Sequence, residues 1–300
     1  MQTYSYVGLD SVGLHRLSYR EWGDPDHPHV VVCVHGLSRN SRDFDFFAQA
    51  MAKDCRVVCL DVAGRGASEW LTKKEDYGYP LYVADSITLL ARVTAPVFPG
   101  GLKGLMRRIL GTRKTPVVDW VGTSMGGLIG MMIAARTQSP IRRLVMNDIG
   151  PLIPAAALAR IGEYVGRDLR FDSLESFEAQ LRKIHAPFGP LTAEQWRHMA
   201  LHSHRRLDDG GIGFHYDPDI ALPLKGLVPG DIDLWALWEQ VKCPALVLRG
   251  ADSDLLSHAT AREMQTRGPG ARVVEFSGVG HAPMLMSEQQ IAPVREFLLS

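Results

Sequence analysis

The chain has no net charge and no long apolar run. Its 33 Lys and Arg residues are balanced by 33 Asp and Glu residues. Binding to a polyanion needs a basic excess, so this balance argues against nucleic acid as a partner. A membrane-spanning helix needs about 20 consecutive apolar residues, and the sequence holds no such run. We therefore expect a soluble protein without stable membrane insertion.

Cysteine is scarce, with four residues in 300. Cys33, Cys55 and Cys59 lie in or beside apolar runs, and Cys243 precedes another such run. No two of them have the spacing of metal ligands, so we expect buried, reduced thiols. The polar and aromatic residues 1–8 lack the cationic and then apolar pattern of a secretory signal, which favours a cytoplasmic protein.

Short β-branched runs alternate with helical patterns along most of the chain. Nearly continuous apolar runs are typical of strands buried on both faces of a parallel sheet, with helices covering each face. The sequence therefore predicts an α/β fold with a mostly parallel central sheet. The expected strands are residues 30–34, 56–60, 117–121, 141–147, 245–248 and 272–276.

A longer segment, residues 153–240, interrupts this alternation. It contains helical patterns at 174–184 and 193–201, broken by Gly and Pro clusters. A chain of 300 residues exceeds the usual size of one domain, so we interpret this segment as a helical insertion. The core domain would then consist of residues 1–152 and 241–300.

A second, smaller insertion is expected at residues 96–114. Its apolar residues recur with helical spacing, and its charged residues are all basic. Docking of the apolar stripe on the main domain is the favoured interpretation. A weak membrane-surface contact by residues 102–114, an active-site flap and a subunit contact are the alternatives. The stripe consists of Leu102, Leu105, Met106, Ile109 and Leu110.

A strand, a glycine-rich turn and a helix follow one another around Ser124. The turn is the GTSMGG segment, residues 122–127, which follows the expected strand at 117–121. A nucleophilic serine needs this context, because a strained turn projects its hydroxyl from the sheet. A Cβ at Gly122 or Gly126 would press against the neighbouring turn, so the spacing of the glycines is also a packing requirement. We predict that Ser124 is a nucleophile.

A second motif, HGL at residues 35–37, ends the expected strand at 30–34. In acyl transfer, an oxyanion forms and needs two backbone N–H donors. One comes from the residue after the nucleophile, which is Met125, and the other from a loop of this kind, which gives Leu37. His35 itself is better suited to bracing the loop than to transferring a proton.

The last predicted strand is followed by the GVGHAP segment, residues 278–283. A histidine in a loop between the last strand and the last helix is well placed to act as the general base for a serine at the carboxyl edge of the sheet. We predict that His281 is this base.

Three aspartates are candidates for the carboxylate that orients His281. Asp252 and Asp254 follow the strand at 245–248, and Asp148 follows the strand at 141–147. We favour Asp254, with Asp252 as the second choice and as a residue that shapes the turn. For Asp148 we favour a capping role.

The order Ser124, Asp and His281 is the order of the α/β-hydrolase arrangement. From about residue 17 to the C-terminus, apart from the two insertions, the sequence resembles that superfamily. The segment DVAGRGAS, residues 61–68, is similar to its turn after the second parallel strand. The resemblance implies an α/β-hydrolase fold with nucleophile Ser124, base His281 and oxyanion donors Leu37 and Met125. The family acid lies three residues after the loop glycine, where Ser253 stands, so a shift of one residue gives Asp254.

The resemblance also implies that residues 153–240 form a helical cap over Ser124. Six aromatic residues in it are candidate pocket walls, with core packing as the default for each: Phe188, Trp196, Phe214, Tyr216, Trp235 and Trp238. His198, His202 and His204 suggest a metal site, but the glutamate of an H-E-x-x-H motif is missing and serine chemistry needs no metal. We therefore expect no metal and no cofactor.

The predicted activity is hydrolysis of a small carboxylic ester or lactone through an acyl-enzyme. Dehalogenases and epoxide hydrolases of this superfamily use an aspartate where Ser124 stands, whereas thioesterases remain open. Short-chain hydroxyacid oligoesters are one candidate substrate. The alternatives are a small-molecule receptor on the same fold that does not turn over its ligand, and an acyltransferase. The predicted partner is a small-molecule substrate, and the sequence does not indicate an oligomeric state.

Overall fold

Eight strands form one central sheet in the computed structural model of the chain, which describes residues 1–95, 116–226 and 230–300. Their order is β1-β2-β4-β3-β5-β6-β11-β12. The six strands from β4 to β12 in this order are parallel, and β1 and β2 add an antiparallel edge. The predicted α/β fold with a mostly parallel sheet is confirmed. The strands are β1 Gln2–Leu9, β2 Leu14–Trp22, β3 His29–Val34, β4 Arg56–Asp61, β5 Val117–Thr123, β6 Ile141–Asn147, β11 Ala245–Gly250 and β12 Arg272–Phe276.

All six predicted strands occur, whereas β1 and β2 were not predicted. In β1, buried and exposed residues alternate at its C-terminal end, so that Tyr6 is buried while Val7 and Leu9 are exposed. An edge strand of this kind has no continuous apolar run. The pattern that revealed the central strands is therefore absent from the sheet's antiparallel edge.

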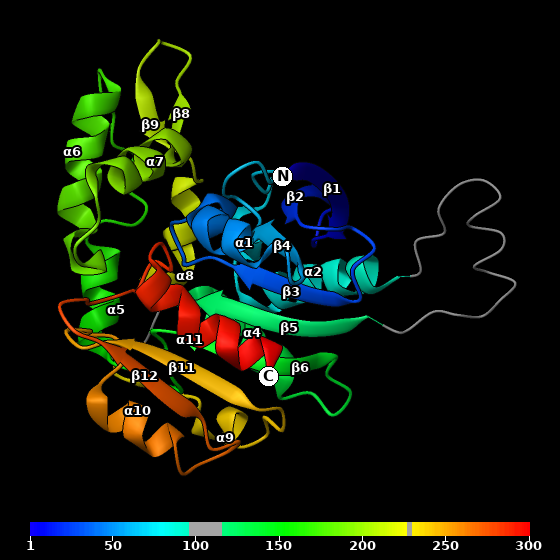
Figure 1. Cartoon of the computed structure of the whole chain (residues 1–300). Helices are drawn as coiled ribbons and strands as arrows, with labels where there is room; N and C mark the ends of the chain where they lie inside the picture. Colours follow the sequence, from blue (N-terminus) through cyan, green and yellow to red (C-terminus); the bar gives the residue numbers. More distant parts are fainter. Residues whose placement is uncertain (96–115, 227–229) are drawn as a thin grey trace, which may run out of the picture.

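Helices cover both faces of the sheet (Figure 1). Successive side chains of a strand point to opposite faces, so Val30 and Val32 belong to one core and Val31 and Cys33 to the other. Helices α2 and α4 pack on the first face, and α1 and α11 pack on the second. Full burial of each such valine stabilises the fold by about 1.5–3 kcal/mol. These helices and the neighbouring α10 are α1 Asp45–Met51, α2 Tyr79–Thr94, α4 Met125–Ala134, α10 His258–Met264 and α11 Glu288–Leu299.

Nearly a hundred residues separate β6 from its sheet neighbour β11, and they form short elements outside the sheet. In Figure 1, α5, α6 and α7 lie beyond the carboxyl ends of β3 and β5. The predicted helices at 174–184 and 193–201 occur as α6 and α7. Each begins at a capping box, on Ser173 and Thr192. The elements are β7 Leu152–Ile153, α5 Ala155–Gly162, α6 Leu174–Ile184, α7 Ala193–Ser203, β8 His204–Arg206, β9 Ile212–Phe214, α8 Leu222–Lys225, β10 Ile232–Asp233 and α9 Trp235–Trp238.

Several sequence predictions concern features that the fold does not test. The division into a core of 1–152 and 241–300 and a cap of 153–240 stays a proposal. The amphipathic insertion 96–114, including its predicted surface contact, lies outside the described residues. Within the described ranges, no helix is long and apolar enough to cross a bilayer. All four cysteines are free, and Cys33, Cys55 and Cys59 are buried as expected, whereas Cys243 is partly exposed.

Candidate active site

Ser124 lies in a tight turn between β5 and α4, with φ 52° and ψ −116°. A residue other than glycine is strained at positive φ, so the surrounding structure must hold this conformation. The two flanking glycines let the turn close. A Cβ on Gly122 would lie 2.2 Å from the carbonyl oxygen of Gly126, and one on Gly126 would lie 2.0 Å from that of Val34. A side chain at either glycine would therefore clash with the neighbouring backbone, as the sequence predicts.

Three side chains form a hydrogen-bonded chain at the carboxyl edge of the sheet. The Oγ of Ser124 lies 3.0 Å from Nε2 of His281, and Nδ1 of His281 lies 2.8 Å from Oδ2 of Asp148. A carboxylate only accepts, so Nδ1–H of His281 donates to Asp148 and Nε2 is left to accept the serine hydroxyl. The three residues come from the turn after β5, the loop after β12 and the end of β6.

The Asp148 carboxylate is fully buried and fully hydrogen-bonded. Its Oδ1 accepts the backbone N–H of Gly250 at 2.7 Å. Its Oδ2 accepts the hydroxyl of Ser253 at 2.5 Å in addition to the imidazole of His281. Donors on both oxygens fix the orientation of the carboxylate and hence that of the imidazole.

The placement predicted for Asp254 is wrong. Its side chain is 47% exposed and forms a two-point ion pair with Arg160 of α5, with Arg160 Nε and Nη2 at 2.5 and 2.9 Å. Asp252 is also exposed, and its backbone N–H donates to Val279. The carboxylate beside His281 is that of Asp148. The signal in the sequence was Ser253, which stands where the resemblance places the acid. We interpreted it as a shift of one residue to Asp254, whereas its hydroxyl donates to Asp148.

The two predicted oxyanion donors lie beside Ser124. Leu37 and Met125 line the same cavity as the serine, and an added Cβ on Gly36 would lie 3.7 Å from the Cβ of Ser124. In the described chain, the N–H groups of Leu37 and Met125 donate to no other backbone or side-chain acceptor. Met125 is also the first residue of α4, where the helix dipole favours negative charge.

Arg65 is fully buried and contacts both of these residues. Its Nε donates to the carbonyl of Leu37 at 2.9 Å, and Nη2 lies 3.8 Å from Sδ of Met125. Its Nη1 donates to the carbonyl of Ala63 and the hydroxyl of Tyr82. Arg65 was not predicted to be a site residue, although it lies in the DVAGRGAS turn.

His35 braces the loop, as expected. Its Nδ1–H donates to the carbonyl of Gly36 at 2.7 Å, and its Nε2 accepts the N–H of Val62 at 3.0 Å. Complete burial lowers the pKa of His35 to about 4, so the imidazole is neutral at neutral pH.

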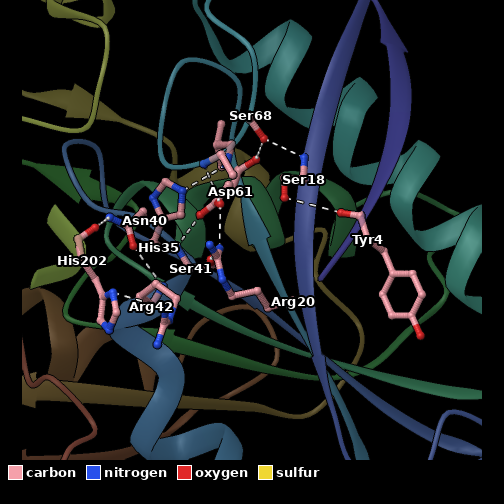
Figure 2. Close-up of polar contacts among 12 residues, drawn as sticks. Tyr4, Ser18, Arg20, His35, Asn40, Ser41, Arg42, Asp61, Ser68 and His202 are labelled. Carbon is pink, nitrogen blue, oxygen red and sulfur yellow. Dashed lines mark hydrogen bonds and ion pairs between the residues drawn. The ribbon is translucent and has the colours of Figure 1, made fainter. Parts of the chain in front are cut away.

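The buried Asp61 holds the next part of this loop (Figure 2). Its carboxylate accepts the N–H groups of Ser41 and Ala67 and pairs with Arg20 at 2.8 Å. Arg20 and these donors keep the pKa of Asp61 below its usual value despite burial, which acts in the opposite direction.

A cavity of about 260 Å³ opens beside Ser124. Its walls are almost entirely aliphatic, and the polar side chains among them are Ser124, Tyr79 and Tyr82. The six aromatic residues proposed as walls do not line it. Phe188 and Trp196 instead pack in a separate core with α6 and α7, and Trp238 packs against the main core. The walls consist of Leu37, Gly78, Tyr79, Tyr82, Ser124, Met125, Leu128, Met132, Ile149, Ile153, Leu158, Ile161, Ile220, Pro223, Leu224, Ile232, Leu234 and Leu255.

Comparison with known proteins identifies the family of the chain. The sequence model of the Alpha/beta hydrolase family matches residues 31–294. The 3-hydroxybutyrate-oligomer hydrolase of Cupriavidus necator is 44% identical over 297 residues, which cover 96% of this chain and 94% of that protein. The chain belongs to the alpha/beta hydrolase family.

Solved structures agree with this assignment. An alpha/beta hydrolase from Novosphingobium aromaticivorans superposes with a TM-score of 0.80 and 32% identity, over 99% of this chain and 98% of that one. An E-2-(acetamidomethylene)succinate hydrolase has a TM-score of 0.76 with full coverage of both chains, and its 22% identity supports the fold alone.

Proposed function

We propose that this alpha/beta hydrolase cleaves small carboxylic esters through an acyl-enzyme on Ser124. The observation that carries the proposal is the Ser124–His281–Asp148 chain, which opens on an aliphatic cavity beside two free backbone donors. A nucleophile in contact with a base, and a base oriented by a carboxylate, form the arrangement that acyl transfer requires.

In the proposed reaction, His281 Nε2 removes the hydroxyl proton of Ser124 as Oγ attacks the ester carbonyl. The resulting oxyanion accepts the N–H groups of Leu37 and Met125. The intermediate then collapses, His281 protonates the departing alcohol, and the acyl group stays on Oγ. In the second half, His281 deprotonates a water molecule as it attacks the acyl carbonyl. His281 then returns the proton to Oγ of Ser124, and the acid is released.

Asp148 acts through His281 in this scheme. Its carboxylate fixes the tautomer in which Nε2 is free to accept a proton, and it stabilises the imidazolium formed at each step. The hydrogen bonds from Gly250 and Ser253 hold the carboxylate in place for this role.

For the substrate we propose a short hydroxyacid oligoester. The relative in Cupriavidus necator is named for hydrolysis of 3-hydroxybutyrate oligomers and covers nearly the whole chain. The aliphatic cavity suits a short acyl group, because its walls offer few polar partners beyond Ser124. No step of this reaction calls for a metal or cofactor. We further propose that the enzyme acts in the cytoplasm.

Burst kinetics with p-nitrophenyl butyrate and labelling with a fluorophosphonate test this proposal. We expect the parent to release a burst of p-nitrophenol, turn over and take up the label, and to hydrolyse the dimer of 3-hydroxybutyrate. Ser124→Ala should retain its melting temperature but lose the burst and the label. Turnover or labelling of Ser124→Ala at the parental rate would rule out the proposed nucleophile.

The same measurements distinguish the alternatives. A receptor would bind or be labelled without steady-state turnover. An acyltransferase would release p-nitrophenol rapidly only when an acceptor alcohol is added, and the product would be a new ester instead of the free acid.

A further inference from the structure

Three potential metal ligands meet where α7 packs against α1, apart from the site around Ser124. His198 and His202 lie one turn apart on α7, and Asp45 is the first residue of α1. One ligand atom from each residue lies within 4.8 Å of the other two. Histidines at positions i and i+4 present their rings on the same helix face, which suits a shared ion.

The Asp45 carboxylate is 9% exposed and incompletely satisfied. Its Oδ2 is paired with Arg42, and Nε2 of His198 lies 3.5 Å from it. Its Oδ1 is buried and has no hydrogen-bond partner within the described chain. A buried carboxylate oxygen without a donor or cation is costly, so this atom has an unused capacity for a ligand.

The guanidinium of Arg42 lies in the same cluster. Its Nε and Nη2 are 2.6 and 2.5 Å from Oδ2 of Asp45. Its Nη1 is 3.2 Å from Nδ1 of His202 (Figure 2). Arginine has only donors, so Nδ1 of His202 must offer its lone pair to this cation. A metal ion bound at Nδ1 of His202 would compete with Arg42 for the same lone pair. The Arg42 side chain is 20% exposed, so part of it already contacts solvent.

We propose that Asp45, His198 and His202 bind a divalent transition-metal ion, with Zn²⁺ as the best-matched example. Two imidazoles and a carboxylate favour such an ion over Ca²⁺ or Mg²⁺, which prefer oxygen ligands. Three protein ligands leave a fourth, tetrahedral position for water. The ion displaces the guanidinium of Arg42 and takes over its role as the cation beside Asp45.

The bound ion would join two elements that are far apart in the sequence. Asp45 follows the loop of residues 35–40, which carries Leu37, whereas His198 and His202 belong to α7. At present Asn40 Nδ2 donates to the carbonyl of His202 at 2.8 Å, and His198 Nε2 lies 3.1 Å from the carbonyl of Arg42. An ion held by Asp45 and the two histidines would replace hydrogen bonds across this contact with metal–ligand bonds, and so would join α7 more firmly to the core of the fold.

Titration of the full-length protein with Zn²⁺ by calorimetry, and with Co²⁺ by visible absorption, tests the proposal. We expect one ion per chain and a Co²⁺ spectrum with nitrogen ligation. His198→Ala and His202→Ala should each weaken binding at least about tenfold. His258→Ala, a change of an exposed histidine on α10, should have no effect.

Arg42→Gln provides the second, independent variant. Because the competing cation is gone, we expect it to bind Zn²⁺ at least about tenfold more tightly than the parent. Such a gain cannot come from misfolding. Unchanged affinity in the folded His198→Ala and His202→Ala variants, or no binding by both the parent and Arg42→Gln, would overturn the proposal.

Discussion

Arg65 is a buried cation whose hydrogen bonds end on carbonyls, a hydroxyl and a sulfur. The rings of Tyr77 and Tyr82 lie 5.8 and 4.9 Å from its guanidinium carbon and add cation–π attraction. By holding the carbonyl of Leu37, Arg65 fixes the peptide plane that precedes Ser38 and the loop that carries the Leu37 N–H. We therefore regard it as a positioning residue for the proposed oxyanion site.

Replacement of Arg65 by methionine should lower kcat for a p-nitrophenyl ester about 10- to 100-fold and change KM little. The reason is that a misplaced N–H can no longer donate to the oxyanion, and this hydrogen bond forms mainly in the transition state. Arg56→Met is the matched control, because Arg56 is also buried but pairs with Glu21 far from the serine. It should lose stability and retain kcat at temperatures where both variants are folded. An unchanged kcat in Arg65→Met would contradict the positioning role.

The buried imidazole of His35 should make stability depend on pH. Its pKa is about 4 in the folded chain and about 6.5 when unfolded, so protonation favours the unfolded state. The neutral His35 contributes fully to the free energy of unfolding above about pH 6.5. As pH falls towards 4, this free energy decreases by about 3 kcal/mol. His35→Asn lacks this group.

Urea unfolding of both proteins between pH 7 and pH 4 provides the measurement for His35. The two proteins share the same carboxylates, so the effects of these groups on stability largely cancel in the comparison. The difference in free energy of unfolding between the parent and His35→Asn should therefore shrink as pH falls. Parallel curves for the parent and His35→Asn would show that His35 is not held neutral.

At the scale of elements, the turn between β5 and α4 depends on close backbone approach. A Cβ on Gly126 would lie 2.0 Å from the carbonyl oxygen of Val34, a distance that requires the turn or β3 to move. Gly126→Ala should therefore destabilise the fold by about 3 kcal/mol or more and abolish turnover. Gly162→Ala should be neutral or stabilise by less than about 1 kcal/mol, since no atom lies within 4 Å of its added Cβ.

Denaturant unfolding and kcat of these two variants test the role of the turn. Equal stability of Gly126→Ala and Gly162→Ala, with turnover retained in both, would mean that the turn tolerates a side chain at Gly126.

The elements that the sequence predicts are those with a strong local pattern. The central strands are continuously apolar, and α6 and α7 begin at Ser173 and Thr192 with capping boxes. The short β8–β9 hairpin, the edge strand β1 and its neighbour β2 were missed. Their stability depends on pairing with distant or neighbouring chain segments, which a local pattern does not report.

At the scale of the whole molecule, the candidate site is assembled at the carboxyl ends of strands that are distant in sequence. Ser124, His281, Leu37 and Met125 could be predicted, because each lies in a local motif at a strand end. The acid could not, since β6 and β11 are sheet neighbours and both end beside the histidine loop. Asp148 and the residues after Gly250 can therefore both reach the position beside His281. The only sequence feature that distinguishes these two positions for the acid is Ser253.

The insertion 96–114 is predicted to be dispensable for chemistry. Ser124, His281 and Asp148 and the two backbone donors all lie outside it. Replacement of 96–114 by a short Gly/Ser linker should keep kcat for a small, soluble ester within about tenfold of the parent. This range corresponds to a change of about 1.4 kcal/mol in the activation barrier. A folded deletion variant that has lost this activity would instead place the segment in the active site.

We propose that Asp148, which directly follows β6, orients His281 and that Asp254, which follows β11, does not. The most direct test compares kcat for p-nitrophenyl butyrate in Asp148→Asn and Asp254→Asn. Loss of the orienting carboxylate leaves the imidazole in the wrong tautomer, so Asp148→Asn should lose about 10⁴-fold in kcat. Asp254→Asn loses an exposed ion pair with Arg160 and should stay within a few-fold of the parent. A large loss of kcat in Asp254→Asn together with a small loss in Asp148→Asn would show that Asp254, and not Asp148, orients His281.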